Sequence, residues 1–193
     1  TTGAIEWVGA TGTTSGAPQG KPLLLLNTWQ TITFDLTDPN SIVAFPGTGA
    51  NGQITGTRGT LEHLAVTMKA DATNRSSGVY VMYVDNVVNV GAAKSRADFV
   101  ITDFEGYALG SEVLLQEPTN SGTTSGNLSA PPSASAVTNA EANGGTQSQM
   151  LTWFFKDTTA QRCARVTTSA TAYKSRPIID LTKPIRMDIL LLP

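Results

Sequence analysis

The sequence is poor in the residues that build disulfides, metal centres and charged surfaces. Its 193 residues include one cysteine and one histidine, and only 15% of them are charged. A single cysteine forms no internal disulfide, and a single histidine excludes a histidine-rich metal site. The formal net charge is -2 and Lys and Arg are dispersed along the chain, which argues against a nucleic-acid partner.

Long apolar runs are also missing. Runs such as Leu23 to Leu26 and Ile189 to Leu192 are far short of the roughly 20 residues that span a bilayer, so we expect no membrane insertion. With 40% hydrophobic residues the chain can build one large core, and we expect a single domain over residues 1–193. Low charge with abundant Thr, Ser, Gly and Asn is typical of secreted bacterial proteins, which predicts an extracellular or cell-surface location.

What the chain does have is a series of short segments with strand patterns. The clearest is Trp29 to Leu36, in which Ile32, Phe34 and Leu36 share the face that we expect in the core. Glycine-rich or polar loops are expected at 9–20, 46–59 and 117–136, and no segment shows a helical period over about 11 residues. The pattern predicts an all-β sandwich or jelly roll. The other expected strands are 4–8, 23–26, 42–45, 61–68, 79–90, 99–101, 113–115, 150–155, 162–168 and 184–192.

Two motifs in the middle of the chain carry a family resemblance. Tyr80 to Val87 (YVMYVDNV) resembles the closing strand of jelly-roll, galactose-binding-like carbohydrate-binding modules of secreted bacterial proteins, and Asp103 to Gly106 (DFEG) resembles their opening. The resemblance implies a jelly roll and a structural calcium ion shared by Glu105 and Asp85, since carboxylates suit this cation. The alternative is that Asp85 caps a turn and Glu105 is merely exposed.

The closing motif precedes the opening motif, which reverses the order of the family. Three explanations stay open: the domain is circularly permuted, the chain is one period of a tandem array, or neighbouring copies complete each other's sheets. In the last two cases the chain divides into halves at 1–92 and 98–193.

The apolar segments near both ends bear on this choice, because an apolar strand needs a cover and a hydrogen-bonding partner. A neighbouring copy could supply both by strand addition, and a head-to-tail contact of this kind does not close and gives filaments or arrays. The partner would then be a copy of the chain itself. The candidate assembly residues are Ile5, Trp7, Ile189, Leu190, Leu191 and Leu192.

No catalytic motif is present, so we expect no enzyme. His63 stands alone between apolar residues, which is typical of a hydrogen-bonded structural histidine. Cys163 alternates with Ala164 in an expected strand, and we expect it to be a buried, inert thiol. The carboxylates, Glu6, Glu62, Glu105, Glu112, Glu117 and Glu141 among them, fall in no recognisable motif.

Polysaccharide is the second candidate partner. Sugars stack on exposed aromatic rings, and Trp29, Tyr107 and Tyr173 are the candidates, with Trp29 favoured because it lies opposite the expected core face. Trp7 and Trp153 have apolar neighbours and are expected in the core. The sequence therefore favours a non-catalytic extracellular structural or adhesive subunit that assembles head to tail. A carbohydrate-binding module is the alternative, and a polysaccharide-active enzyme is a minor one.

Overall fold

The chain folds as an all-β sandwich in the computed structural model, which describes residues 4–14, 17–23, 25–47, 49–69, 78–91, 99–122, 124–129, 133–168 and 176–192. Regular structure in these ranges consists of strands and short 3-10 helices at Pro39–Ser41, Pro118–Asn120 and Ser125–Asn127. No helix of the described part is long and apolar enough to cross a bilayer.

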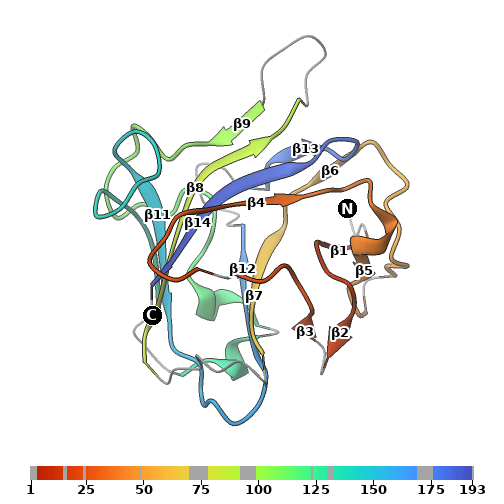
Figure 1. Cartoon of the computed structure of the whole chain (residues 1–193), viewed down its shortest axis with the longest axis horizontal. Helices are drawn as coiled ribbons and strands as arrows, with labels where there is room; N and C mark the ends of the chain where they lie inside the picture. The colour runs from red at the N-terminus through yellow and green to blue at the C-terminus, as the bar shows by residue number, and fades with distance from the viewer. Residues whose placement is uncertain are drawn as a thin grey trace.

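One layer of the sandwich is a continuous antiparallel sheet (Figure 1). Its strands follow the order β10-β11-β8-β14-β4, and β9 pairs with the far end of β8. The bounds are β10 Ala134–Thr138, β11 Ser148–Trp153, β8 Tyr80–Asn89, β14 Ile185–Leu192, β4 Gln30–Phe34 and β9 Phe99–Thr102.

Strand β8 is the centre of this sheet because it is apolar on both faces. Its sequence YVMYVDNVVN is rich in Val and Tyr, which favour strands. It pairs with β11 through Tyr80 to Val84, with β14 along most of its length, and with β9 through its last residues. Met82, Val84 and Val87 are completely buried.

Strand β14 is also internal to the sheet. Ile185 to Ile189 pair with β4 on one side, and the strand pairs with β8 on the other side up to Leu192. Beyond β4, the backbone N–H of Asn27 donates to the carbonyl of Leu191 at 3.0 Å. The apolar run that follows Asp188 therefore has strand partners within the chain.

The opposite layer is divided into separate strand pairs. The strand β12 pairs with β7, β1 with β5, and β13 with β6, while β2 and β3 form a small hairpin. In Figure 1, β7 and β12 cross the middle of the view and β1 and β5 lie to their right. The bounds are β1 Glu6–Val8, β2 Thr13–Thr14, β3 Ala17–Pro18, β5 Ile42–Ala44, β6 Arg58–Thr60, β7 His63–Met68, β12 Arg162–Thr167 and β13 Ile178–Asp180.

The two halves of the sequence are interleaved in both layers. In the large sheet, β8 from the first half lies between β11 and β14 from the second. In the opposite layer, β7 pairs with β12 and β6 with β13. The fold is thus assembled from both halves of one chain.

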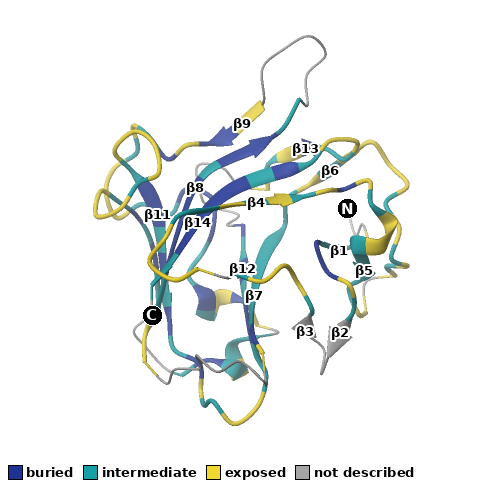
Figure 2. Ribbon diagram, in the orientation of Figure 1, coloured by how far each residue is buried: buried dark blue, intermediate teal, exposed yellow. Residues whose placement is uncertain are grey.

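The most buried part of the core lies under the large sheet. Leu151, Trp153 and Phe104 are 0–1% exposed, and the ring of Tyr80 stacks on Trp153 with centroids 5.6 Å apart. Figure 2 shows the buried residues concentrated along β8, β11 and β14. Trp7 and Trp153 are both buried, as their apolar neighbours predicted.

Two buried amides fasten irregular segments to the sheet. Gln149 accepts the N–H groups of Leu114 and Leu115, and its Nε2 donates to the carbonyl of Leu115 and to Ser135 Oγ, both at 2.7 Å. Asn89 Oδ1 accepts the N–H of Asp180 at 2.7 Å. Buried amides that satisfy both their oxygen and their nitrogen hold a unique packing arrangement.

The structure corrects several expected elements. In the stretch predicted as a strand at 23–26, the described residues form none, and Leu25 is 54% exposed. Val113 and Leu115 are buried but make only an isolated bridge, from Leu115 to Thr168, because Gln149 occupies the N–H of Leu115. The loops expected at 9–20, 46–59 and 117–136 contain β2 and β3, the start of β6 and the start of β10, respectively.

Candidate functional site

Three acidic side chains gather around the β10–β11 turn, and we refer to Asp85, Glu105 and Asp188 as the carboxylate cluster. Asp85 on β8 and Asp188 on β14 are partners in the strand register. Asn86 beside them has a positive φ of 48°, which asparagine tolerates better than most residues. Its side chain donates to Asp188 Oδ2 at 2.9 Å.

Each acid of the cluster is tied to the turn by hydrogen bonds. Asp85 accepts the N–H groups of Asn86 and Asn143 at 2.7 and 2.8 Å. Glu105 accepts the N–H groups of Thr146 and Gln147, each at 2.7 Å. Asp85 and Glu105 therefore both bond to the β10–β11 turn, through different residues of it.

The motif Asp103 to Gly106 explains how Glu105 reaches the turn. Phe104 is completely buried and has a φ of 62°, an unfavourable backbone conformation for a bulky residue. The N–H of Phe104 donates to Thr102 Oγ1 at 3.0 Å, and that of Glu105 to Asp103 Oδ1 at 3.2 Å. The buried ring anchors the tight turn and leaves Glu105 facing the β10–β11 turn.

The acids differ in how easily they ionise. Burial raises the pKa of Asp85 to about 6, against the effect of its two N–H partners, and the charges of Asp188 and Glu105 act in the same direction as burial. The N–H groups of Thr146 and Gln147 hold the pKa of Glu105 below its usual value. Because Asp85 is completely buried, its carboxyl does not reach a substrate in solution.

The fit of the cluster to calcium is mixed. Three neighbouring carboxylates favour a cation. Yet both oxygens of Asp85 already accept N–H groups, whose positive ends point toward the place where an ion would bind. No group of three or more His, Cys, Asp or Glu in the described residues is arranged to hold a metal ion. Calcium binding by Asp85 and Glu105 stays a prediction.

The second candidate site is a cleft between the two layers, with a volume of about 1960 Å³. It is lined by apolar side chains from both layers, among them the half-buried Ile32, Phe34 and Leu64. Its other walls come from β1 and the segment before β4. The side chains of β8 at its inner end, Met82 and Val84, are completely buried.

His63 lies on the wall of this cleft. Its ring packs against Trp7 with centroids 4.5 Å apart, and burial together with Arg165 lowers its pKa to about 4. The imidazole is therefore neutral at neutral pH and is a weak base. This agrees with a structural histidine, although its contacts are with aromatic rings.

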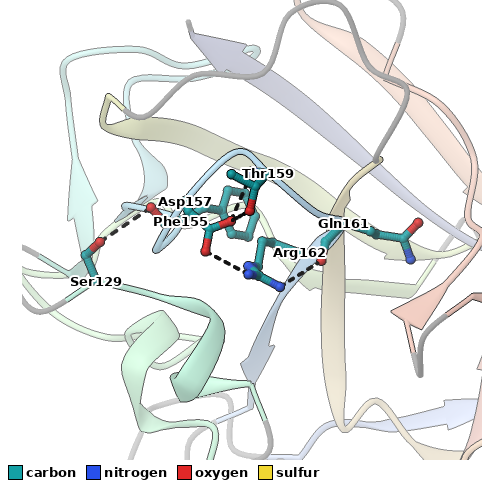
Figure 3. Close-up of polar contacts among 6 residues, drawn as sticks. All are labelled: Ser129, Phe155, Asp157, Thr159, Gln161 and Arg162. Atoms are coloured by element: carbon teal, nitrogen blue, oxygen red, sulfur yellow. Dashed lines mark hydrogen bonds and ion pairs between the residues drawn. The ribbon is translucent and has the colours of Figure 1, made fainter.

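The β11–β12 connection holds a separate group of polar contacts (Figure 3). Asp157 accepts an ion-paired hydrogen bond from Arg162 at 2.7 Å, and this bond together with those from Thr159 lowers its pKa to about 2. The backbone of Gln161 accepts a second bond from Arg162, and its side chain accepts one from Gln19 at 3.4 Å. Arg162 is thus already paired, and it stands in register with Met68 at the end of β7.

The aromatic residues proposed for sugar binding lie in different surroundings. Trp29 is half-buried immediately before β4. Tyr107 packs against the core, and its carbonyl accepts a hydrogen bond from Gln147. Tyr173 lies outside the described residues. Sugar binding by these residues stays a prediction.

The candidate assembly residues are paired within the chain. The carbonyl of Ile5 accepts the N–H of Phe45 at 3.1 Å, and Trp7 pairs with Val43 in β5. The partners in β8 of the β14 residues Ile189, Leu190, Leu191 and Leu192 are, respectively, Val84, Tyr83, Met82 and Val81. Cys163 is buried with a raised pKa, as an inert thiol should be.

Sequence reasoning missed two members of the acidic site and one exposed strand. Two signals in the sequence were available: Asp188 interrupts an apolar strand, and Asn143 precedes a Gly-Gly turn. Strand β9 was expected, but its place at the edge was not: Phe99 and Val100 are 48% and 49% exposed.

No protein-family model, curated protein or solved structure matches the chain. The likeness to carbohydrate-binding modules thus rests on the sequence motifs alone.

Proposed function

We propose that the chain is a non-catalytic extracellular structural or adhesive subunit that associates head to tail with copies of itself. The observation that carries the proposal is the edge strand β9. Natural sheets protect their edges with charges, proline or a cover. The sequence of β9 is FVIT, and Phe99 and Val100 are about half exposed on it. An apolar edge of this kind favours pairing with another chain.

The extracellular location is proposed from composition, namely low charge with many Thr, Ser, Gly and Asn. Strands β14 and β1 each have strand partners within the chain. We therefore place the proposed contact at β9 and not at these two strands. A contact through β9 needs no rearrangement of the large sheet, because among the described strands β9 pairs with β8 alone.

Sedimentation velocity over a range from micromolar to near-millimolar protein tests this proposal. We expect the average mass of the native chain to rise with concentration without a plateau, and electron microscopy to show filaments or arrays. Phe99→Asp should lower the association constant at least tenfold. Leu109→Asp is the matched control, because Leu109 is 57% exposed but lies outside the strands. A native chain that stays monomeric throughout contradicts the proposal.

Polysaccharide binding through Trp29 is the second candidate. It is favoured by the partly exposed ring of Trp29 and by the exposed side chains of Thr28 and Thr31 beside it. Affinity electrophoresis with a panel of polysaccharides, comparing the native chain with Trp29→Ala, measures it directly. Retention that is lost in Trp29→Ala at an unchanged melting temperature would make this the leading function. Equal mobility with and without every polysaccharide would remove it.

A further inference from the structure

A pocket much smaller than the cleft lies at one end of the strand pair formed by β7 and β12. Its volume is about 240 Å³, and its lining includes His63, Arg165 and Thr167. Pockets for drug-sized molecules are usually about 300–1,000 Å³. The size of this pocket therefore suits a small ligand or a single group of a larger molecule.

The strand register explains why these three side chains meet. Thr167 and His63 are partners in the antiparallel pair, and Arg165 lies opposite Ala65 two positions further along. Opposite residues share one face of a strand pair, and so do alternate residues of one strand. Val166, between Arg165 and Thr167, belongs to the buried core. The three side chains therefore share the face that is turned away from the core.

The pocket offers hydrogen-bond donors that the protein leaves without acceptors. Gln116 lines it, and its Oε1 accepts the hydroxyl of Thr167 at 3.0 Å, which orients the amide. Within the described residues, Gln116 Nε2 has no acceptor. The same holds for the two terminal nitrogens of Arg165, whose Nε donates to Ser121 Oγ at 2.9 Å. None of these three nitrogen atoms is fully enclosed, so each is open to a ligand.

Positive charge predominates in the lining. Arg165 has no carboxylate partner within the described residues, and burial lowers its pKa because the charged group has lost part of its hydration. Arg176 is exposed and only loosely paired, since its Nε lies 3.7 Å from Glu62 Oε2. His63, with its pKa of about 4, adds no charge at neutral pH. Two guanidinium groups and one carboxylate thus leave one positive charge uncompensated in the described lining.

We propose that this pocket binds a small carboxylate. A guanidinium group presents its N–H groups as a planar fork that matches the two oxygens of a carboxylate. One negative charge balances the uncompensated charge of the lining, whereas Glu62 repels a more highly charged anion. Arg165 holds the charged group, and Gln116 Nε2 donates to one of its oxygens. No residue of β9 lines the pocket, so this inference is independent of the proposed self-association.

An NMR chemical-shift titration of the native chain tests the site, with sodium acetate as the probe. Acetamide, which has nearly the same shape but no charge, and sulfate, which has two charges, are the comparison ligands at constant ionic strength. We expect acetate to give saturable shifts at the amide groups of Gln116, Thr167 and Thr168. Acetamide should give none, and sulfate should bind more weakly than acetate. The absence of saturable acetate shifts overturns the proposal, as does equal or tighter binding of acetamide or sulfate.

Substitutions then assign the binding to the two donor side chains. Arg165→Gln should weaken acetate binding by about tenfold or more, because the fork and its charge are lost. Arg186→Gln is the matched control and should bind as the native chain does, because Arg186 is also a half-buried arginine on a strand but does not line the pocket.

Gln116→Glu is the second variant, and it keeps the test decisive if Arg165→Gln does not fold. It retains an oxygen that can accept the Thr167 hydroxyl, but it places a negative charge in the pocket. Acetate binding should be lost at an unchanged melting temperature. Native acetate affinity in either variant overturns the proposal. The titrations use protein below the concentration at which it associates, so their outcome is separate from that of the proposed function.

Discussion

The six-stranded sheet and the opposite layer use similar residues, but they differ in how completely their strands are paired and their side chains buried. In the sheet, β8 and β14 each have neighbours on both sides, and residues such as Val84 and Leu151 are completely buried. In the opposite layer, β7 has one strand partner within the described ranges, and Leu64 and Val66 on it are only half-buried beside the cleft. The large sheet is therefore the more closely packed of the two layers.

Matched leucine substitutions give the largest expected contrast between the two layers. Leu151→Ala should lower the free energy of unfolding by about 3 kcal/mol, because it leaves a cavity in a closely packed region. Leu64→Ala should lower it by about 1 kcal/mol, because its side chain already borders open space. Urea denaturation measures both. Equal losses would show that the cleft closes in solution.

Substitutions of two glutamines compare a buried polar side chain in the large sheet with a polar side chain in a connecting loop. Gln149→Leu should cost about 2–3 kcal/mol, because the N–H groups of Leu114 and Leu115 lose their buried partner. Gln161→Leu, in the β11–β12 connection, should change the stability by less than about 0.5 kcal/mol, because its side-chain bond to Gln19 is long at 3.4 Å. The melting temperatures of the two variants report the difference, and a similar fall in both would remove the distinction.

Substitutions in the β10–β11 turn test whether Glu105 holds this turn in place. Gly145 has a φ of +65°, and a Cβ there would collide with the Glu105 carboxylate. Gly145→Ala should therefore cost about 2 kcal/mol. Gly144→Ala is the control, since its Cβ would meet Asn86 at an ordinary 3.5 Å. Thermal melting separates them, and equal stability would mean that Glu105 does not hold the turn.

The free energy of unfolding should depend on pH through Asp85 in the same region. Asp85 has a pKa of about 6 in the folded chain, above its ordinary value of 3.8, so folding favours its protonated form. This contribution is complete below pH 3.8 and is lost as the pH rises through about 6. Between pH 5 and pH 7 the native chain should lose about 1 kcal/mol. Asp85→Asn should abolish this slope, and a slope that survives would assign the effect to another group.

Calcium has the smallest expected effect. If Asp85 and Glu105 bind the ion as the resemblance implies, millimolar calcium should raise the melting temperature by a few degrees, and a chelator should reverse the shift. Asp85→Asn should remove the response, whereas Asp157→Asn should keep it. A melting temperature that ignores both calcium and chelator removes the calcium prediction.

The fold class was predictable from the sequence because period-two alternation is a local signal. Trp29 to Leu36 was identified as a strand by its alternation, which β4 shows in its burial, whereas Tyr80 to Val87 was identified by its Val and Tyr content. The segments at 23–26 and 113–115 failed because apolarity alone does not say whether a backbone finds a strand partner. The short strands β6 and β13 were missed because each is stabilised by the other, far away in sequence.

The candidate sites were predictable only in part, for a similar reason. Asp85 and Glu105 were identified from motifs, but Asp188 and Asn143 join them through pairing that the sequence does not display. The cleft is lined by side chains from both layers. Such a property belongs to the whole fold and has no local sequence signal.

The position of β14 has a consequence for biosynthesis. Thr31 on β4 bonds to Asp188 on β14 across 157 positions of the chain. At about 5–20 residues per second, β4 waits roughly 8 to 30 seconds on the ribosome for its partner. Contacts of such long range also make folding slow. During this interval β4 and β8 lack the strand that joins them, so their apolar side chains stay uncovered in the nascent chain.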